Sequence, residues 1–140
     1  MIRKKSGFTL VELLVVIAII AVLVSIAIIQ YTNLKKSAYR NVVRNDLKNS
    51  LTMIIGFISS YKSFPSNGSC GPGPISCDLN DGYNTITNAI NVSRDVIIEW
   101  RITQNGCSDG STRIFLIGRH SELKNWTATF DSCSQKYTNF

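Results

Sequence analysis

The chain has 140 residues, a formal net charge of +6 and a single histidine, His120. Three of the positive charges lie at residues 3–5, so the overall charge does not by itself indicate a nucleic-acid partner. His120 has no evident acidic or nucleophilic companion in the sequence. We therefore expect His120 to be a surface residue, and we expect no catalytic site and no enzyme.

An apolar segment follows the basic start of the chain. From Leu13 to Ile29 the only polar residue is Ser25, and counted from Phe8 the segment is 22 residues long. At ~1.5 Å per residue, a helix of this length spans a hydrocarbon core of ~30 Å. The sequence therefore predicts a membrane-spanning helix over residues 8–29.

A secretory signal peptide is the alternative interpretation of the same residues. Arg3, Lys4 and Lys5 would form its basic region, and Ser25-Ile26-Ala27 would form its cleavage site. However, the apolar stretch is longer than the roughly 7 to 15 residues usual in signal peptides, and Glu12 lies inside it. Both features favour the membrane helix.

Glu12 is the one charged residue in the apolar segment. A charge inside a membrane helix costs ~2.5 to 3.5 kcal/mol on insertion scales, so we expect something to neutralise it. One interpretation is that Glu12 lies near the end of the span and extends into the headgroup layer without any further function. The other is that a cation pairs with the carboxylate.

The residues around Glu12 resemble the start of the type IV pilin family. Lys4-Lys5-Ser6-Gly7 is followed by Phe8-Thr9-Leu10-Val11-Glu12-Leu13 and by an unbroken apolar stretch. The resemblance in sequence covers about 25 residues. Beyond these residues only the architecture is similar. The pseudopilins of type II secretion share the same pattern.

The resemblance implies a leader peptide, residues 1–7, which a prepilin peptidase removes at the cytoplasmic face of the membrane by cutting between Gly7 and Phe8. The new amine of Phe8 is then usually methylated. Glu12 matches the family glutamate thought to pair with the Phe8 amine of an adjacent subunit. The implied partners are identical or homologous pilin subunits, the prepilin peptidase, an inner-membrane assembly platform and the membrane. The implied location is the inner membrane of a bacterium for the precursor, and then an extracellular filament.

The helix is expected to continue beyond the apolar segment. Many pilins carry a glycine and a proline in the apolar helix, whereas residues 21–29 contain neither, and no proline occurs before Pro65. We expect one mostly continuous helix from about Thr9 to Tyr61, roughly 80 Å long at ~1.5 Å per residue. Its second part, residues 30–61, is predicted to be amphipathic, with an apolar face formed by Leu34, Ala38, Val42, Leu47, Leu51, Ile54, Ile55 and Ile58.

Basic residues lie at steps of four on this amphipathic part. They are Lys36, Arg40, Arg44 and Lys48, which we call the basic ridge. The ridge has three interpretations: contact with acidic groups of neighbouring subunits, binding of a polyanion such as DNA, or a solvated helix face. No run of aromatic residues interleaves with the ridge to stack bases, so nucleic acid is the least favoured partner.

The head, residues 62–140, follows the helix. Residues 64–82 contain all three prolines and four glycines, so we expect a loop there. The spacing of Tyr83, Ile86 and Ile90 suggests a short helix. β-Branched and aromatic residues predict antiparallel strands near 96–103, 111–117 and 126–130, with a turn at Asn105-Gly106 and Asp109-Gly110 between the first two.

The head contains four cysteines on the side of the membrane that is expected to face outward, where disulfides persist; they are Cys70, Cys77, Cys107 and Cys133. Of the three pairings we favour Cys70–Cys77, which closes a Gly/Pro loop, and Cys107–Cys133, which ties the strand turn to the C-terminal segment. The second pair matches in position the disulfide-bounded loop common in pilins. A zinc site is the alternative, but the spacings lack the short gaps typical of zinc ligands.

Residues 78–82, Asp-Leu-Asn-Asp-Gly, are rich in oxygen donors like a calcium loop. They miss the spacing of the twelve-residue calcium motif and have no glutamate at its end, so turn chemistry accounts for them well enough. We expect no metal site and no cofactor.

The expected fold is α+β, with a long N-terminal α-helix packed against a small antiparallel β-sheet head with disulfides. The expected function is that of a structural subunit of a type IV pilus, which polymerises through its apolar helix into an extracellular filament for adhesion, motility or DNA uptake. Two alternatives stay open: a pseudopilin of a type II secretion system and a DNA-binding minor pilin.

Overall fold

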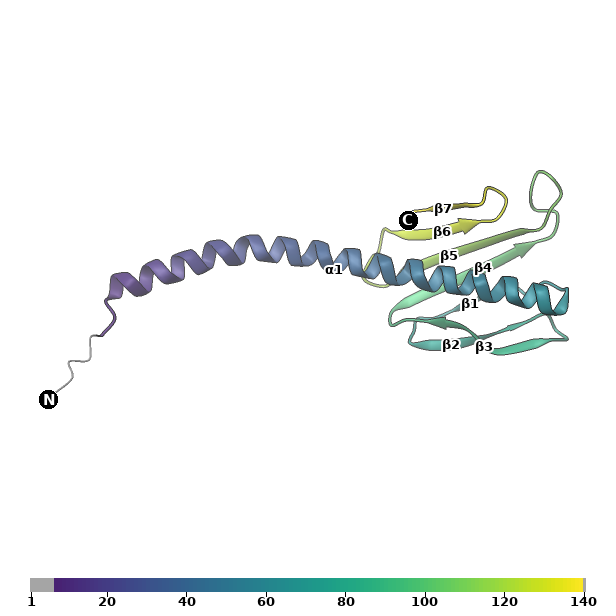
Figure 1. Ribbon diagram of the computed structural model, residues 1–140, viewed down its shortest axis with the longest axis horizontal. Helices are drawn as coiled ribbons and strands as arrows, with labels where there is room; N and C mark the ends of the chain where they lie inside the picture. The colour runs from purple at the N-terminus through teal and green to yellow at the C-terminus, as the bar shows by residue number, and fades with distance from the viewer. Residues whose placement is uncertain (1–6, 140) are drawn as a thin grey trace. The chain divides into compact units, whose positions relative to one another are not determined.

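The computed structural model describes residues 7–139, so the predicted leader, apart from Gly7, lies outside the described residues. The described part has one helix and seven strands, in the order α1 (Leu10–Tyr61), β1 (Gly68–Cys70), β2 (Ile75–Asn80), β3 (Thr85–Val92), β4 (Val96–Thr103), β5 (Arg113–His120), β6 (Thr127–Asp131) and β7 (Lys136–Thr138). This composition confirms the α+β prediction (Figure 1).

The chain forms two compact units, Met1–Lys36 and Ser37–Phe140, and α1 contributes to both. The helix is continuous from Leu10 to Tyr61, which confirms the prediction of an unbroken helix. The first unit, in its described part, consists of Gly7, Phe8, Thr9 and α1 as far as Lys36. The second unit contains the rest of α1 and all seven strands.

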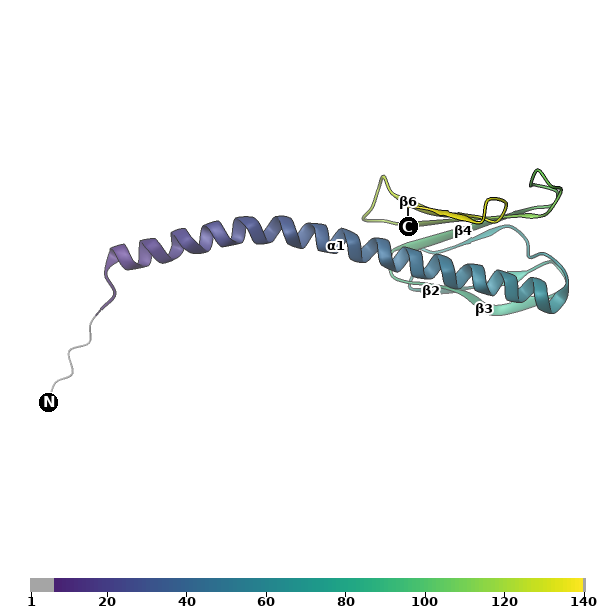
Figure 2. The same cartoon turned by 45° about the horizontal axis from the view of Figure 1, so that its top comes forward.

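Two antiparallel sheets make up the second unit. The larger sheet has five strands in the order β1-β4-β5-β6-β7, and the smaller sheet is the β2-β3 hairpin. Figure 2 shows the five-stranded sheet and the hairpin on different sides of the second part of α1. This part of the helix therefore has apolar partners from both sheets.

The core lies between α1 and the two sheets. Side chains alternate between the two faces of a strand, so one face of β4 and β5 carries Val96, Ile98, Trp100 and Leu116, which are all buried. They form one cluster with buried residues of α1: Val43, Leu47, Leu51, Ile54 and Phe57. These helix residues recur every three or four positions, which is the period of one helix face.

Gly118 of β5 sets how closely the helix approaches the sheet. A Cβ atom at position 118 would lie 2.6 Å from Cγ1 of Val43 and 3.0 Å from Cδ1 of Leu47. Both distances are shorter than a carbon–carbon contact of about 3.5 to 4.0 Å. Only glycine therefore fits at this crossing without displacing the helix.

The apolar face of residues 30–61 was predicted only in part. Leu47, Leu51 and Ile54 are buried as expected, whereas the side chain of Leu34 is 69% exposed and that of Ile55 is 52% exposed. Ile55 directly follows a buried residue, and adjacent positions on a helix point about 100° apart. It therefore falls outside the stripe that the sheets cover.

The prediction of a loop over residues 64–82 was wrong, because β1 and β2 lie within it. Pro65 precedes β1, while Pro72 and Pro74 lie between the two strands. Proline lacks a backbone N–H and is excluded from the interior of a ladder. Here the prolines mark the ends of short strands and interrupt no ladder.

The prediction of a short helix at residues 83–90 was also wrong, because β3 occupies Thr85–Val92. Ile86 and Ile90 are four residues apart, a spacing that also places two side chains on the same face of a strand. In the hairpin, Ile86 lies opposite Leu79 and Ile90 lies opposite Cys77. The strands predicted near 96–103, 111–117 and 126–130 correspond to β4, β5 and β6, the last two displaced by one to three residues.

Candidate functional site

The start of α1 is held by a reciprocal hydrogen-bond pair between Thr9 and Glu12. The Glu12 N–H donates to Oγ1 of Thr9 (3.2 Å), while the Thr9 N–H donates to Oε2 of Glu12 (2.8 Å). The Thr9 hydroxyl also donates to Oε2 (2.8 Å). This is a capping box, in which a Thr before the first helical residue and a Glu three positions later satisfy the first N–H groups of a helix. It fixes the helix start at Leu10.

The predicted cleavage site lies just outside this cap. Gly7 and Phe8 precede α1, are not helical, and are both exposed, with Phe8 at 85%. The Gly7–Phe8 peptide bond is therefore accessible in the lone chain. The capping box leaves the Phe8 backbone nitrogen unused, so a terminal amine at this position is compatible with the cap.

Glu12 accepts both Thr9 bonds on the same carboxylate oxygen, Oε2. The residue is exposed and lies in the first turn of α1. A negative charge there interacts favourably with the positive end of the helix dipole. Within the described residues, Oε1 has no hydrogen-bond partner, so it can accept a cation while the cap stays intact.

The apolar surface of α1 extends from the cap to Leu34. Every large apolar side chain from Phe8 to Ile29 is between 47% and 85% exposed. Within the described residues, α1 is the one helix long and apolar enough to cross a membrane, by its length and composition. An exposed apolar surface this extensive needs lipid or other apolar helices around it.

The basic ridge is partly engaged within the chain. The guanidinium groups of Arg40 and Arg44 each lie 5.8 Å from the ring centroid of Trp126. Arg44 also donates from Nε (3.3 Å) and Nη2 (3.1 Å) to the carbonyl oxygen of Asn139. Arg44 therefore fixes the C-terminal segment to the helix, whereas Arg40 and Lys48 are exposed.

His120 lies in the interior, contrary to the expectation of a surface residue. Its side chain is 6% exposed, and its ring stacks on Tyr39 with the ring centroids 4.1 Å apart. Its Nδ1 accepts a hydrogen bond from the Glu122 N–H (3.1 Å). The residue thus packs the loop between β5 and β6 against α1.

Asp46 was not singled out in the sequence, yet it joins the helix to the head. It is 7% exposed, and its carboxylate accepts hydrogen bonds from the backbone N–H (2.7 Å) and hydroxyl (3.1 Å) of Ser93. Burial raises the pKa of Asp46 above its ordinary value, and the two bonds from Ser93 oppose this shift. A lone acid among basic residues gives no sequence signal for such a contact.

The cysteines form the two disulfides that were favoured, Cys70–Cys77 and Cys107–Cys133. The first joins β1 of the five-stranded sheet to β2 of the hairpin. The second joins the β4–β5 turn to the β6–β7 turn, which lie at the same end of the sheet because Phe115 of β5 pairs with Asp131 of β6. All four sulfur atoms are committed, which contradicts the zinc alternative.

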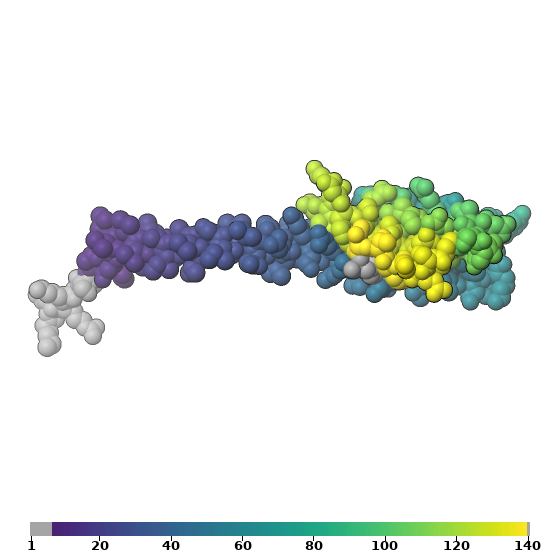
Figure 3. Space-filling view, turned by 90° about the horizontal axis from the view of Figure 1, so that it is seen from above, coloured from purple at the N-terminus to yellow at the C-terminus, as the bar shows by residue number. Residues whose placement is uncertain are grey.

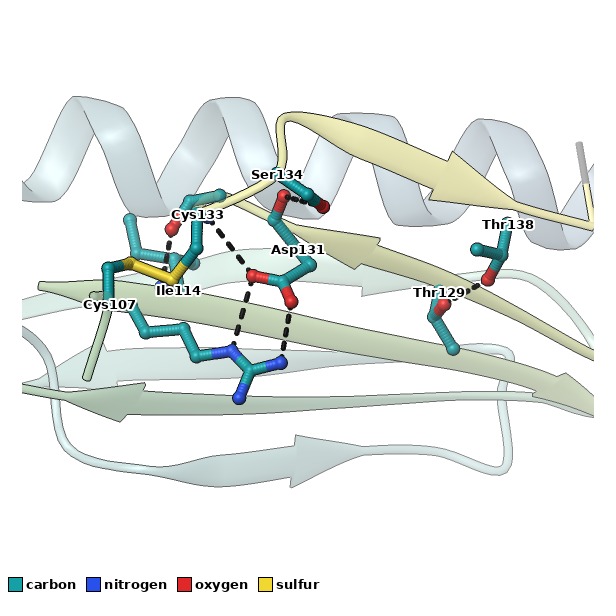
Figure 4. A network of polar contacts seen from close by, with 9 residues as sticks. Cys107, Ile114, Thr129, Asp131, Cys133, Ser134 and Thr138 are labelled. Carbon is teal, nitrogen blue, oxygen red and sulfur yellow. Dashed lines mark hydrogen bonds and ion pairs between the residues drawn. A yellow bond between two sulfur atoms is a disulfide. The ribbon is translucent and has the colours of Figure 1, made fainter. Parts of the chain in front are cut away.

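Asp131, two residues before Cys133, holds the backbone next to the second disulfide by hydrogen bonds (Figure 4). Its carboxylate accepts two bonds from the Arg113 guanidinium (3.2 and 2.5 Å) and one from the Cys133 N–H (3.0 Å). The bonds from Arg113 hold the pKa of Asp131 below its ordinary value. Figure 3 shows this C-terminal segment, in yellow, and the green β4–β5 turn on the same face of the molecule.

The two acids of residues 78–82 hold the hairpin in shape. Asp78 accepts a hydrogen bond from the Asn88 N–H (2.8 Å), and Asp81 accepts from the N–H groups of Tyr83 (2.9 Å) and Asn84 (2.7 Å). Asp81 also accepts from the Ser63 hydroxyl, and these bonds hold its pKa well below the ordinary value. Their carboxylates serve turn chemistry, as the spacing suggested.

Residues 2–28 match a family model, the prokaryotic N-terminal methylation motif. This motif is the hallmark of type IV pilin and pseudopilin precursors, so the resemblance found in the sequence is confirmed. The match contains Gly7, Phe8, Thr9 and Glu12, which the structure brings together at the start of α1. A search of curated proteins gave no match, and a search of solved structures gave none either.

Proposed function

We propose that this chain, which carries the N-terminal motif of type IV pilin and pseudopilin precursors, is a structural subunit of an extracellular type IV pilus. The observation that carries the proposal is the exposed apolar surface of α1 from Phe8 to Ile29, which begins at a capped helix end with an acid. A bilayer covers this surface in the precursor, and the apolar helices of other subunits cover it in the filament. On transfer from the bilayer to the filament, contacts with lipid are replaced by contacts with other apolar helices, so the hydrophobic free energy changes little.

In this proposal Glu12 fixes the register between subunits. After a prepilin peptidase has cut between Gly7 and Phe8, each subunit carries an amine on Phe8, usually methylated, and a carboxylate on Glu12. The Phe8 amine of a neighbour pairs with Glu12 while the Thr9 bonds to Oε2 stay in place. A subunit inserted out of register leaves a charge unpaired in an apolar core, which costs several kcal/mol.

The second disulfide favours a pilus over a pseudopilus. The Cys107–Cys133 disulfide encloses an exposed turn and two strands, β5 and β6, an arrangement like the surface loop of pilins. In this proposal the precursor lies in the inner membrane, and an assembly platform extracts it into the filament. A DNA-binding minor pilin is less favoured, because the ring of Trp126 is already covered by two arginines and Arg44 is bound to Asn139.

Substitutions of Glu12 and Thr9 test the pairing role. Glu12→Gln keeps an oxygen acceptor for the capping box but removes the charge, whereas Thr9→Ala removes the capping hydroxyl and keeps the charge. We expect Glu12→Gln and Glu12→Ala to abolish filaments seen by electron microscopy while the chain still fractionates with the membrane. Thr9→Ala should retain filaments, and Glu122→Ala serves as the control for loss of an acid elsewhere.

Filaments formed normally by Glu12→Gln would refute the pairing, because the cap alone would then explain the acid. The mass of the mature N-terminus tests the processing step independently. We expect the mature chain to begin at Phe8, and we expect Gly7→Val to remain uncut. A mature chain that begins at Ile28 would show a signal peptide instead and would refute the filament subunit.

A further inference from the structure

A cavity of about 320 Å³ lies between α1 and β3 in the second unit. Its floor is apolar, because Ala89 is buried and Met53 is half-buried. Its rim consists of four exposed side chains that carry uncharged amide or hydroxyl groups: Asn49, Thr52, Asn88 and Asn91. Small-molecule sites in proteins usually combine a concave apolar surface with a few convergent polar groups. The cavity has this combination, and the proposed function does not use it.

A β-bulge in β3 places two asparagines on this cavity. Side chains three positions apart on a regular strand point to opposite faces, so Asn88 and Asn91 would otherwise lie on opposite sides of the hairpin. The register of β2 and β3 shifts at Asp78, and residues 87–89 lie opposite this one residue. Asn88 has a φ of 52°, which asparagine tolerates better than most residues, and its N–H donates to the Asp78 carboxylate (2.8 Å). Bulges commonly redirect a side chain next to a functional site, and here both amides line the cavity.

The amides on the rim have hydrogen-bonding groups available for a ligand. Within the described residues, the side-chain amides of Asn49 and Asn88 have no hydrogen-bond partner, so each offers two N–H donors and a carbonyl acceptor. Asn91 is held in place, since its Nδ2 donates to the Asn88 carbonyl oxygen (3.3 Å) and its Oδ1 accepts from the Ser76 hydroxyl. A ligand in the cavity therefore meets donors and acceptors on both walls, α1 and β3.

We propose that this cavity binds a neutral saccharide. Asn49 and Asn88 bond to neighbouring hydroxyl groups of one sugar ring, and the C–H face of the ring packs on Met53. A hydroxyl group both donates and accepts, and an amide side chain offers a donor and an acceptor on one group. The inference goes beyond the proposed function and does not depend on it. All six lining residues lie in the second unit, whereas membrane anchoring and subunit register are assigned to the first part of α1.

The lining argues against other classes of ligand. Among the described residues that line the cavity none is charged, so a charged ligand would find no opposite charge there. A wholly apolar ligand would cover the amides of Asn49 and Asn88 without giving them partners, which is unfavourable. None of the described lining residues is aromatic, which argues against a nucleobase. An extended peptide spreads its polar groups at about 3.3 Å per residue, whereas a cavity of this size accommodates a compact ring.

Side-chain amide NMR of the full chain tests the site. The chain is solubilised in a phosphocholine detergent, because the headgroups of maltoside detergents are themselves saccharides. It is titrated separately with cellobiose, lactose and N,N′-diacetylchitobiose, and with a blocked trialanine peptide as the probe for peptide binding. At least one disaccharide should shift the side-chain NH2 signals of Asn49 and Asn88 until they saturate. The side-chain signals of Asn105, an exposed asparagine in the β4–β5 turn, should not move.

Variants on two different elements locate the ligand. Asn49→Ala on α1 and Asn88→Gly on β3 should each weaken binding about fivefold, which corresponds to about 1 kcal/mol, the net value of one hydrogen bond. Glycine accepts the positive φ of the bulge, so the backbone signals of β2 should stay unchanged in Asn88→Gly. Asn45→Ala changes an exposed asparagine of α1 outside the cavity and should bind as the wild-type chain does.

Three results would overturn the inference. The absence of saturable shifts with all three disaccharides overturns the site and leaves the proposed function unaffected. Equal shifts with the blocked peptide overturn the saccharide assignment. Undiminished binding by both Asn49→Ala and Asn88→Gly places the sugar elsewhere and likewise overturns the site.

Discussion

The two parts of α1 contain similar apolar side chains but differ in what covers them. Between Phe8 and Ile29 every large apolar side chain is about half exposed or more, whereas Val43, Leu47, Ile54 and Phe57 are completely buried by the sheets. The second part finds its partners later in the same chain. The first part has none among the described residues and must find them in a bilayer or in other subunits. The second part of the helix thus serves folding, and in the proposed function the first part serves assembly; burial distinguishes the two parts.

A matched pair of leucines should give the largest difference between the two parts. Leu47→Ala removes a fully buried side chain and should lower the free energy of unfolding of the second unit by about 2 to 5 kcal/mol, because it loses burial and leaves a cavity. Leu34→Ala removes a side chain that is 69% exposed and should change it by less than about 0.5 kcal/mol. Guanidinium unfolding in detergent, followed by the fluorescence of the buried Trp100, measures both.

Similar losses for the two leucines would show that Leu34 is covered within the chain. The distinction between a folding half and an assembly half of α1 would then have to be redrawn. The same kind of truncation at another exposed site of the helix, Ile55→Ala, provides a further reference.

The sequence predicted the regular parts of this molecule well. The length of the apolar segment, the absence of proline before Pro65 and the β-branched run at 96–103 determine α1 and β4 with little help from tertiary contacts. The hairpin of β2 and β3 was missed because its signals are ambiguous. Apolar residues four positions apart fit both periods, and prolines between short strands look the same as prolines in a loop.

The candidate site was predicted through its motif, while its local contacts were not. The sequence Thr9-x-x-Glu12 is itself a capping-box pattern and could have been read as one. The burial of Asp46 and His120 could not have been predicted in this way. Asp46 contacts Ser93, 47 residues away in the sequence, and His120 contacts Tyr39, 81 residues away. Long-range contacts of single polar residues leave no local pattern.

Removal of the second disulfide should affect the second unit alone. Cys107→Ser with Cys133→Ser opens a crosslink over a sequence separation of 26 and should lower the free energy of unfolding by about 3.5 kcal/mol if the loss is entropic. The exposed apolar part of α1 lies outside this loop, so membrane fractionation should be unchanged. Loss of membrane association in this variant would contradict the separation of the two parts. The Asp131–Arg113 pair remains as a control for local order, measured by exchange of the β6–β7 turn.

The smallest expected effect concerns Asp46, the buried acid in the second part of α1, and the dependence of stability on pH. Asp46 is buried, and its folded-state pKa is raised above its ordinary value of 3.8. An acid of this kind contributes stability that is fully present below the ordinary value and is lost as pH rises through the folded-state pKa. Asp131, with its lowered pKa, has the opposite sign, and its contribution is lost as pH falls.

Asp46→Asn isolates the contribution of Asp46 to the pH dependence of stability, because Asp131 is the same in the variant and in the wild-type chain. Asparagine keeps an oxygen acceptor for the Ser93 N–H and removes the charge, so at neutral pH the free energy of unfolding should change by only about 1 kcal/mol. Relative to this variant, the wild-type chain should lose stability as the pH is raised above 3.8, measured by unfolding at several pH values. A wild-type curve parallel to that of the variant would mean that the Ser93 bonds fully offset burial. The charge of Asp46 would then have no net cost in the second unit, and apolar burial alone would distinguish the two parts of α1.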